Sequence, residues 1–263
     1  MTSEVSGHFG EWFQGIEPST GDLVAVSVPC QTLRARATRL SVGALTLDGD
    51  ARAASRDQVA RLFDALGLEP GAFQLQLGMP PGGGAGASTA SLVALARAAG
   101  YEGSDLACAC VEIEGASDPL MFEAQDTLLW SPRRGKVIER LEPPPTVEIV
   151  GGFWGDPIKT DPADFNFPEV GDLIDRWRDV RTPKEAARVA SISAERTTAL
   201  RGPDGDPTPI IVSQIGALGW LRAHTGSARG LIFPPGAVPE NAEAHLLEAG
   251  YSGILRFQTG GEV

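Results

Sequence analysis

Residues Met79 to Ala99 read M-P-P-G-G-G-A-G-A-S-T-A-S-L-V-A-L-A-R-A-A, a glycine-rich loop that leads directly into an alanine- and leucine-rich segment. Ser88 and Thr89 are typical of a first helical turn, so the pattern predicts a loop over 80–86 and a helix over 88–99. Glycines let backbone N–H groups face an anion, and a helix N-terminus adds unpaired donors. The stretch therefore predicts an anion-binding site; the alternative is a solvated loop with an ordinary serine cap.

Two familiar phosphate-loop patterns fit this stretch less well. A Walker A loop needs Gly-Lys-Ser/Thr, and the three lysines of the chain, Lys136, Lys159 and Lys184, all lie elsewhere. A dinucleotide fingerprint, G-x-G-x-x-A, fits residues 82–87, with Asp105 about 20 residues further on. However, two prolines precede it, and the second half of the chain lacks repeated strand–helix units. A nicotinamide-dependent oxidoreductase remains an alternative.

The composition is that of a folded, acidic protein. The chain has 263 residues, is 42% hydrophobic and carries a formal net charge of −12, which suits one or two domains with a real core. The acidic balance argues against nucleic-acid binding, because a phosphate backbone attracts basic patches. No apolar run approaches the ~20 residues of a membrane span, no signal peptide is recognisable, and three cysteines are too few for a disulfide framework. We expect a reduced, cytoplasmic protein without nucleic-acid or membrane partners.

The remaining elements mix strands and helices. Period-two patterns and Val- or Thr-rich runs predict strands, whereas apolar residues three and four apart predict helices. The expected strands are 22–28, 31–47, 73–77, 106–114, 147–150, 230–233 and 253–258. The expected helices are 55–66, 88–99, 169–180, 184–200 and 240–249. This order predicts an α+β fold of two parts, and the stiff run at 141–145, L-E-P-P-P, predicts the junction between them.

Three motifs, in order, resemble those of the GHMP kinases. Residues 80–90, P-P-G-G-G-A-G-A-S-T-A, resemble the second motif of that superfamily, P-x-x-x-G-x-x-S-S/T-A. Residues 6–15, S-G-H-F-G-E-W-F-Q-G, are similar to the opening G-x-x-G-E-x-x-Q-G of one branch, the L-threonine kinases of cobalamin synthesis and propanediol utilisation. Residues 216–219, G-A-L-G, and 223–231, A-H-T-G-S-A-R-G-L, are similar to a C-terminal run of the same branch.

The resemblance implies a two-domain α+β fold. An N-terminal ATP-binding domain, like domain 2 of ribosomal protein S5, would span 1–142, and a ferredoxin-like C-terminal domain would span 146–263. It also implies a helix at 209–212, where β propensity favours a strand. The implied activity is transfer of phosphate from ATP, with Mg²⁺, to a small alcohol acceptor, first of all L-threonine. A homodimer is the expected assembly, and a non-catalytic nucleotide- or metabolite-binding homologue is the alternative function.

Phosphoryl transfer needs the nucleotide phosphates, Mg²⁺ and the acceptor hydroxyl held together. The resemblance implies that ATP binds at Pro81, Gly82, Gly83, Gly84, Ala85, Gly86, Ala87, Ser88 and Thr89. Ser88 is the expected catalytic hydroxyl and, with Glu114, the expected metal ligand, since Mg²⁺ prefers hard oxygen donors. On a strand over 106–114, Glu112 and Glu114 would share a face; the alternative is a solvated face.

Asp118 is the expected general base, because it falls where the threonine kinases have Glu-Pro-x-Asp. The alternative is an Asx-turn residue before proline, and Asp126 is a weaker candidate for the base. The expected acceptor-binding residues are Glu11 (placed between glycine-rich turns), Gln14, His224 and Gly226.

The chain departs from the branch pattern at several positions. Branch members have Lys where Gly83 stands, Ser where Ala87 stands, Asp where Ser91 stands and Cys where His8 stands. Losing the lysine removes a cation near the phosphates, and losing the serine removes a metal contact. A different acceptor, slow turnover or a degenerate binding protein are therefore alternatives to an efficient threonine kinase.

Overall fold

One continuous sheet organises the chain, whose computed structural model describes residues 1–50 and 52–261. Its strand order is β10-β7-β9-β8-β1-β2-β4-β3, and β5 and β6 attach beside β2. The strands are β1 (Thr2–Glu17), β2 (Asp22–Val42), β3 (Thr46–Gly49), β4 (Gly71–Leu77), β5 (Leu128–Ser131), β6 (Lys136–Arg140), β7 (Val147–Phe153), β8 (Gly219–Arg222), β9 (Ala228–Phe233) and β10 (Ser252–Thr259). The helices are α1 (Arg56–Leu66), α2 (Ala87–Ala98), α3 (Leu106–Glu114), the 3-10 helix η1 (Gln125–Thr127), α4 (Gly171–Arg178), α5 (Pro183–Arg201), α6 (Thr208–Ile215) and α7 (Ala242–Glu248). The α+β class expected from the sequence is confirmed.

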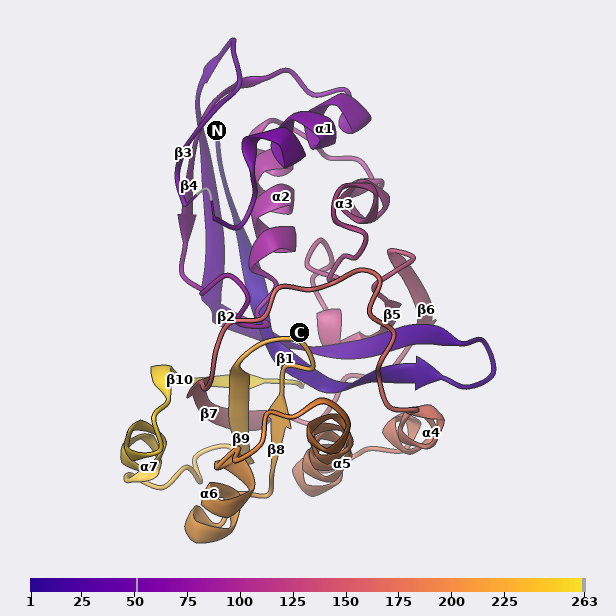
Figure 1. Cartoon of the computed structure of the whole chain (residues 1–263), viewed down its shortest axis with the longest axis vertical. Coiled ribbons are helices and arrows are strands. Elements are labelled where there is room, and N and C mark those ends of the chain that lie inside the picture. Colours follow the sequence, from indigo (N-terminus) through magenta and orange to yellow (C-terminus); the bar gives the residue numbers. More distant parts are fainter. Residues whose placement is uncertain (51, 262–263) are drawn as a thin grey trace.

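The long strands β1 and β2 form an antiparallel hairpin at the centre of the sheet (Figure 1). Their pairing shifts register next to His8 and Glu11, and Gly10 has a φ of +68°. Such bulges bend a strand and turn its side chains. The prediction of glycine-rich turns here was wrong, because these glycines mark bulges inside a strand. The irregular part of β1 carries His8 and Glu11.

Helices α1, α2 and α3 lie together on one face of the N-terminal strands (Figure 1). α1 begins at a capping box of Ser55 and Gln58 and ends at Gly67, which has a left-handed conformation. α2 is almost wholly buried against β1 and β2, which agrees with its alanine-rich sequence. The predicted helices 55–66 and 88–99 are confirmed to within two residues.

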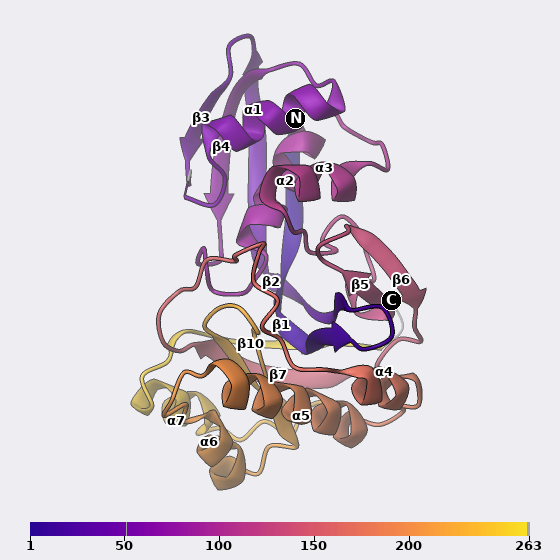
Figure 2. The same ribbon diagram turned by 45° about the vertical axis from the view of Figure 1, so that its right-hand side comes forward.

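Helices α4 to α7 cover one face of the C-terminal strands (Figure 2). α5 begins at a capping box of Thr182 and Glu185, with Pro183 in its first turn, and packs on β8 and β1. The predicted helices 169–180, 184–200 and 240–249 are confirmed within a few residues. α6 confirms the helix implied by the family resemblance, against the local β propensity.

The predicted strand over 106–114 is wrong, because this segment forms helix α3. The alternation A-C-A-C-V-E-I-E has a period of two, yet the buried residues are Leu106, Ala107, Ala109 and Cys110, a helical spacing. Packing against α1 and α2 decided the conformation. Glu112 and Glu114 consequently do not share a face: Glu112 is exposed, whereas Glu114 is partly buried.

Two separate strands were predicted over 22–28 and 31–47. In the structure most of these residues belong to one strand, β2, which continues through Pro29. The predicted strands 73–77, 147–150, 230–233 and 253–258 are confirmed. The proline-rich run at 141–146 has no regular structure and joins β6 to β7. The division into domains 1–142 and 146–263 stays a prediction, since β1 pairs with β8 and continues the sheet across both segments.

Within the described residues, none of the helices combines the length and the apolar character that crossing a membrane requires.

Candidate active site

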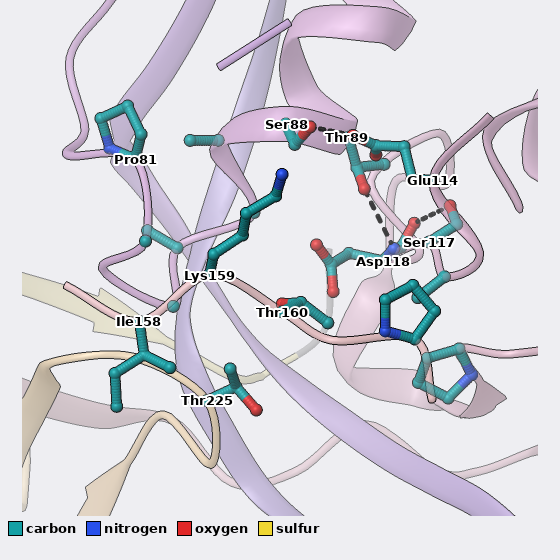
Figure 3. Close-up of a pocket in the computed structure, with 18 of the residues that line it drawn as sticks. Pro81, Ser88, Thr89, Glu114, Ser117, Asp118, Ile158, Lys159, Thr160 and Thr225 are labelled. Atoms are coloured by element: carbon teal, nitrogen blue, oxygen red, sulfur yellow. Dashed lines mark hydrogen bonds between the residues drawn. The ribbon is translucent and has the colours of Figure 1, made fainter. Parts of the chain in front are cut away.

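A cleft of about 640 Å³ lies over the glycine loop, residues 80–86, and the first turn of α2 (Figure 3). Residues 154–170, called the strap below, cross it on the other side. The cleft brings together most of the site residues expected from the sequence: Glu11, Gln14, Pro81, Gly82, Gly84, Ala85, Gly86, Ala87, Ser88, Thr89, Glu114 and Asp118. The exceptions are Gly83, His224 and Gly226, which lie next to it.

Four carbonyls of the glycine loop are engaged by other segments. Each accepts a backbone hydrogen bond: Gly82 from Ile158 (2.9 Å), Gly83 from Ala228 (2.8 Å), Gly84 from Gly10 (3.2 Å) and Ala85 from His8 (3.2 Å). Among the described residues, no backbone carbonyl accepts from the N–H groups of 84–88, and no side chain caps α2. The start of α2 therefore presents free donors together with the positive end of its dipole, which suits a phosphate.

Close packing explains two of the glycines. A Cβ on Gly84, which has a φ of +75°, would lie 2.2 Å from the Cβ of Ala223. A Cβ on Gly226 would lie 2.4 Å from the backbone nitrogen of Gly84. The absence of a side chain at Gly226 thus lets the turn between β8 and β9 pack directly against the backbone of the glycine loop.

Ser88 is not the cap of α2, since Gly86 occupies that position. Its hydroxyl donates to the carbonyl of Ala53 (2.8 Å) and also contacts a carboxylate oxygen of Glu114 (Figure 3). Gln58 of α1 donates to the same oxygen at 3.4 Å. Helices α1, α2 and α3 thereby meet at one polar point on the cleft wall.

Glu114 titrates near neutrality. Burial raises its pKa to about 7, a rise to which Asp118 adds and which Ser88 and Lys159 oppose. Among the described residues no group of three or more His, Cys, Asp or Glu could hold a metal ion. Mg²⁺ needs no such cage, because it takes one or two protein oxygens and completes its shell with water and phosphate. The adjacent oxygens of Ser88 and Glu114 fit that requirement.

Asp118 follows α3 and is held in place by its neighbours. Its backbone N–H donates to the Thr89 hydroxyl (3.3 Å), and its carbonyl accepts from Ser117 (3.1 Å). Figure 3 shows the carboxylate pointing into the cleft. Its side chain is 34% exposed, so a small molecule in the cleft can reach it.

His8, which the sequence singled out only as a departure from the branch pattern, is the charge partner of Asp118. Its Nε2 lies 3.5 Å from a carboxylate oxygen of Asp118, and its Nδ1 lies 3.2 Å from the carbonyl of Gly10. Burial alone would lower the pKa of His8, but Asp118, Glu11 and the Gly10 carbonyl together raise it to about 9. In return, although burial would raise the pKa of Asp118, the charge of His8 holds it below its ordinary value.

Glu11 and His224 form a second buried pair. One carboxylate oxygen of Glu11 accepts from the backbone N–H of His224 (3.2 Å) and lies 3.0 Å from its Nδ1. The Nε2 of His224 lies 2.8 Å from the hydroxyl of Ser193, which accepts from the backbone N–H of Gln14. Burial lowers the pKa of His224, against the opposing charge of Glu11. His224 therefore orients Glu11, which itself lines the cleft.

Three other residues considered from the sequence lie outside the cleft. Asp126 is buried in η1, where burial raises its pKa to about 6. Glu112 is exposed on α3. Ser91, where the branch has Asp, is fully buried and donates to the carbonyl of Ala87 (2.7 Å).

Sequence reasoning missed Lys159 and Arg133, both of which line the cleft. Each stands in a segment without periodicity or motif. The only available signal was the scarcity of lysines, which makes each of the three a candidate wherever a phosphate needs a cation.

The comparisons with known proteins identify the fold. No protein-family model matches the sequence, and no curated protein matches it. Solved structures match over almost the whole chain. A mevalonate kinase from Methanococcus jannaschii is 15% identical, with a TM-score of 0.66, and the match covers 100% of this chain and 98% of that one.

Two further solved structures give the same result. A homoserine kinase from Cytophaga hutchinsonii is 17% identical, with a TM-score of 0.60, over 98% of this chain and 94% of the other. A 4-(cytidine 5'-diphospho)-2C-methyl-D-erythritol kinase is 17% identical, with a TM-score of 0.56, over 100% of both chains. At sequence identities this low, a structural match shows the fold and nothing more. The chain has the mixed α+β fold of the GHMP kinases.

Proposed function

We propose that the chain is an ATP-dependent kinase of a small alcohol, with L-threonine as its preferred acceptor and O-phospho-L-threonine as the product. One observation carries the proposal: among the described residues the N–H groups of 84–88 have no backbone partner, and the uncapped start of α2 lines a cleft that is also lined by the carboxylates of Glu11, Glu114 and Asp118. The fold shared with mevalonate and homoserine kinases supports it.

The residues divide the reaction between them. The N–H groups of 84–88 bind the phosphates of ATP, and Ser88 and Glu114 would hold the Mg²⁺ that accompanies them, which neutralises phosphate charge. Asp118 accepts a hydrogen bond from the acceptor hydroxyl and aims its oxygen at the γ-phosphorus. The bond from that phosphorus to the β-phosphate oxygen breaks as the bond to the acceptor oxygen forms.

The acceptor proton passes to Asp118 and then to water. Because the low pKa of Asp118 makes it a weak base, its main contribution is orientation. A loose transition state requires little proton removal before the phosphorus is transferred, so such a base suffices.

The acceptor side of the cleft has two carboxylates, Glu11 and Asp118, for one cation, His8. Glu11 and Asp118 line it, and Gln14 adds a neutral polar group. An ammonium group on the acceptor suits these carboxylates, which favours an amino alcohol or a hydroxy amino acid over a simple diol. L-threonine, and with it a role in cobalamin side-chain synthesis or propanediol utilisation, follows from the sequence resemblance. A cytoplasmic location and a homodimer stay predictions.

The decisive assay measures ADP release from Mg-ATP with L-threonine, L-serine, L-homoserine, ethanolamine and aminopropanol. Release that depends on L-threonine and falls at least 100-fold in Asp118→Asn, a loss typical of a removed catalytic group, supports the proposal. Release with another acceptor keeps the kinase and discards the threonine assignment. ATP binding without release from any acceptor favours the alternative, a nucleotide-binding homologue.

A further inference from the structure

The glycine loop carries no cation, and the packing explains why. A Cβ at Gly83 would lie 2.8 Å from the ring of Phe153 and 2.9 Å from the side chain of Pro80. A lysine at this position would therefore have to displace Phe153. Arg97, in the same stretch, instead donates to the carbonyl of Met121 near the far end of α2. Any positive side chain near the phosphates must come from another segment.

The strap passes directly over the loop. Its Ile158 N–H donates to the carbonyl of Gly82 at 2.9 Å, and a Cβ on Gly82 would lie 3.0 Å from the side chain of Pro157. On the far side of the cleft, Arg133 donates to the carbonyls of Asp161 (2.9 Å) and Asp164 (3.2 Å). The residues between these two attachments, 159 and 160, are thereby fixed across the cleft.

Lys159 reaches from the strap into the cleft. Figure 3 shows its amine pointing toward Ser88 at the start of α2. Its charge is close enough to Glu114 to oppose the rise in the pKa of that carboxyl. Among the described residues, no carboxylate lies within the 4 Å of an ion pair with Lys159.

The other cations that line the cleft each contact groups of their own. His8 faces Asp118 at 3.5 Å, and Arg52, at the outer edge, pairs with Asp50 at 3.0 Å. Arg133 donates from its Nη2 to the two strap carbonyls, while its Nε and Nη1 are buried without a hydrogen-bond partner. Lys159 is the cation of the cleft whose amine points toward Ser88 in the first turn of α2 (Figure 3).

We propose that Lys159 is a catalytic residue that stabilises the phosphoryl group during transfer, supplying from the strap the positive charge that the glycine loop lacks. The inference rests on the proposed function and names a further residue of the same site. Lys159 forms no covalent bond and keeps its protons. As phosphorus moves from the β-phosphate oxygen to the acceptor oxygen, the ammonium donates to oxygens of the transferred group, where negative charge is concentrated.

The chain offers matched controls, because its other two lysines are exposed and do not line the cleft: Lys136 on β6 and Lys184 in the first turn of α5. Lys159→Met should lower kcat about 10²- to 10³-fold, the range for loss of one preorganised donor. Lys159→Arg should restore part of the loss, and Lys136→Met and Lys184→Met should stay within twofold of the wild type. Wild-type kcat in Lys159→Met would overturn the proposal.

A second measurement separates this inference from the proposed function. Equilibrium binding of ATP and of AMP is compared in the wild type and in Lys159→Met, so that no turnover is needed. Lys159→Met should weaken ATP binding about tenfold or more and leave AMP binding unchanged, since AMP lacks the β- and γ-phosphates that the ammonium would contact. If the wild type binds ATP but transfers nothing, this result keeps Lys159 as a phosphate ligand while the kinase proposal fails. Equal loss for ATP and AMP, or none for either, would reject the role of Lys159.

Discussion

His8 and Asp118 face each other at 3.5 Å across the junction of β1 and the segment that follows α3. The pKa of His8, raised to about 9, makes it a cation at neutral pH. The pair is joined to the rest of the site through Glu11, whose carboxylate lies 3.8 Å from His8 and 3.0 Å from His224. The positive charge of His8 on β1 therefore lies opposite the negative charge of Asp118 on the segment that follows α3.

His8→Gln should destabilise the protein at low pH and much less at high pH. The folded pKa lies above the ordinary value of 6.5, so the stabilisation is complete below pH 6.5 and is lost as the pH rises through 9. The shift corresponds to about 3 kcal/mol. Urea unfolding at pH 6 and pH 10 measures it, and His245→Gln, on α7, is the control. Equal losses at both pH values would contradict the ion pair.

Glu114→Gln should increase the Mg²⁺ concentration needed for half-maximal activity and lower kcat about 100-fold, because an amide binds Mg²⁺ poorly. The pH dependence gives an independent readout. Burial raises the pKa of Glu114 to about 7, so its contribution to stability is complete below pH 4.5 and is lost as the pH rises through 7. Without Mg²⁺ at pH 8.5, Glu114→Gln should be more stable than the wild type by roughly 2 kcal/mol.

Glu112→Gln serves as the control for that substitution. Glu112 lies two residues away on the same helix and is exposed. The Glu112→Gln variant should need the same Mg²⁺ concentration for half-maximal activity as the wild type and should have the same stability. A comparable effect of both substitutions would assign the result to the net charge of α3 instead of the cleft.

Gly84→Ala should abolish ATP binding, because the added Cβ meets Ala223 at 2.2 Å and forces the loop away from the turn between β8 and β9. Gly100→Ala is the matched control: Gly100 also has a positive φ, +99°, but a Cβ added there would have no atom of the described residues within 4 Å. That variant should lose roughly 1–2 kcal/mol of stability from backbone strain and bind ATP normally. Calorimetric ATP titration of both variants tests the difference.

Glu11→Gln should raise KM for acceptors that carry an ammonium group about tenfold and leave KM for propane-1,2-diol unchanged. Its carboxylate lines the cleft, and the amide would keep an acceptor oxygen for His224 while removing the negative charge. Steady-state kinetics of Glu11→Gln and the wild type, with L-threonine and with propane-1,2-diol as acceptors, measure both KM values. An equal change for both acceptors would make Glu11 a supporting residue only.

The glycine loop shows how far local sequence reaches. Glycines followed by Ser88 and an alanine-rich run predicted both a helix and an anion site, since these are properties of adjacent residues; the helix is confirmed, and the anion site stays a prediction. The segment 106–114 shows the limit. Alternating small and apolar residues fit a strand as well as a helix, and the neighbours α1 and α2 determined the outcome.

The site residues that the sequence did not indicate depend on contacts between distant segments. Lys159 reaches the cleft because Ile158 is bound to Gly82, and His8 becomes charged because Asp118 lies opposite it. Neither partner is close in sequence. Glu114, by contrast, was predicted as a metal ligand on a wrong strand, and the helix placed it beside Ser88 nonetheless.

The pairing of β1 with β8 has a consequence for synthesis on the ribosome. Glu11 lies opposite Arg222 in the sheet, and the backbone of His224 holds its carboxylate. A nascent chain that ends before β8 leaves β1 with an unpaired edge, which invites aggregation. Because such long-range pairings form late, fragments that lack β8 and β9 should have no acceptor pocket, and the site should be completed only as the last of these strands leaves the exit tunnel.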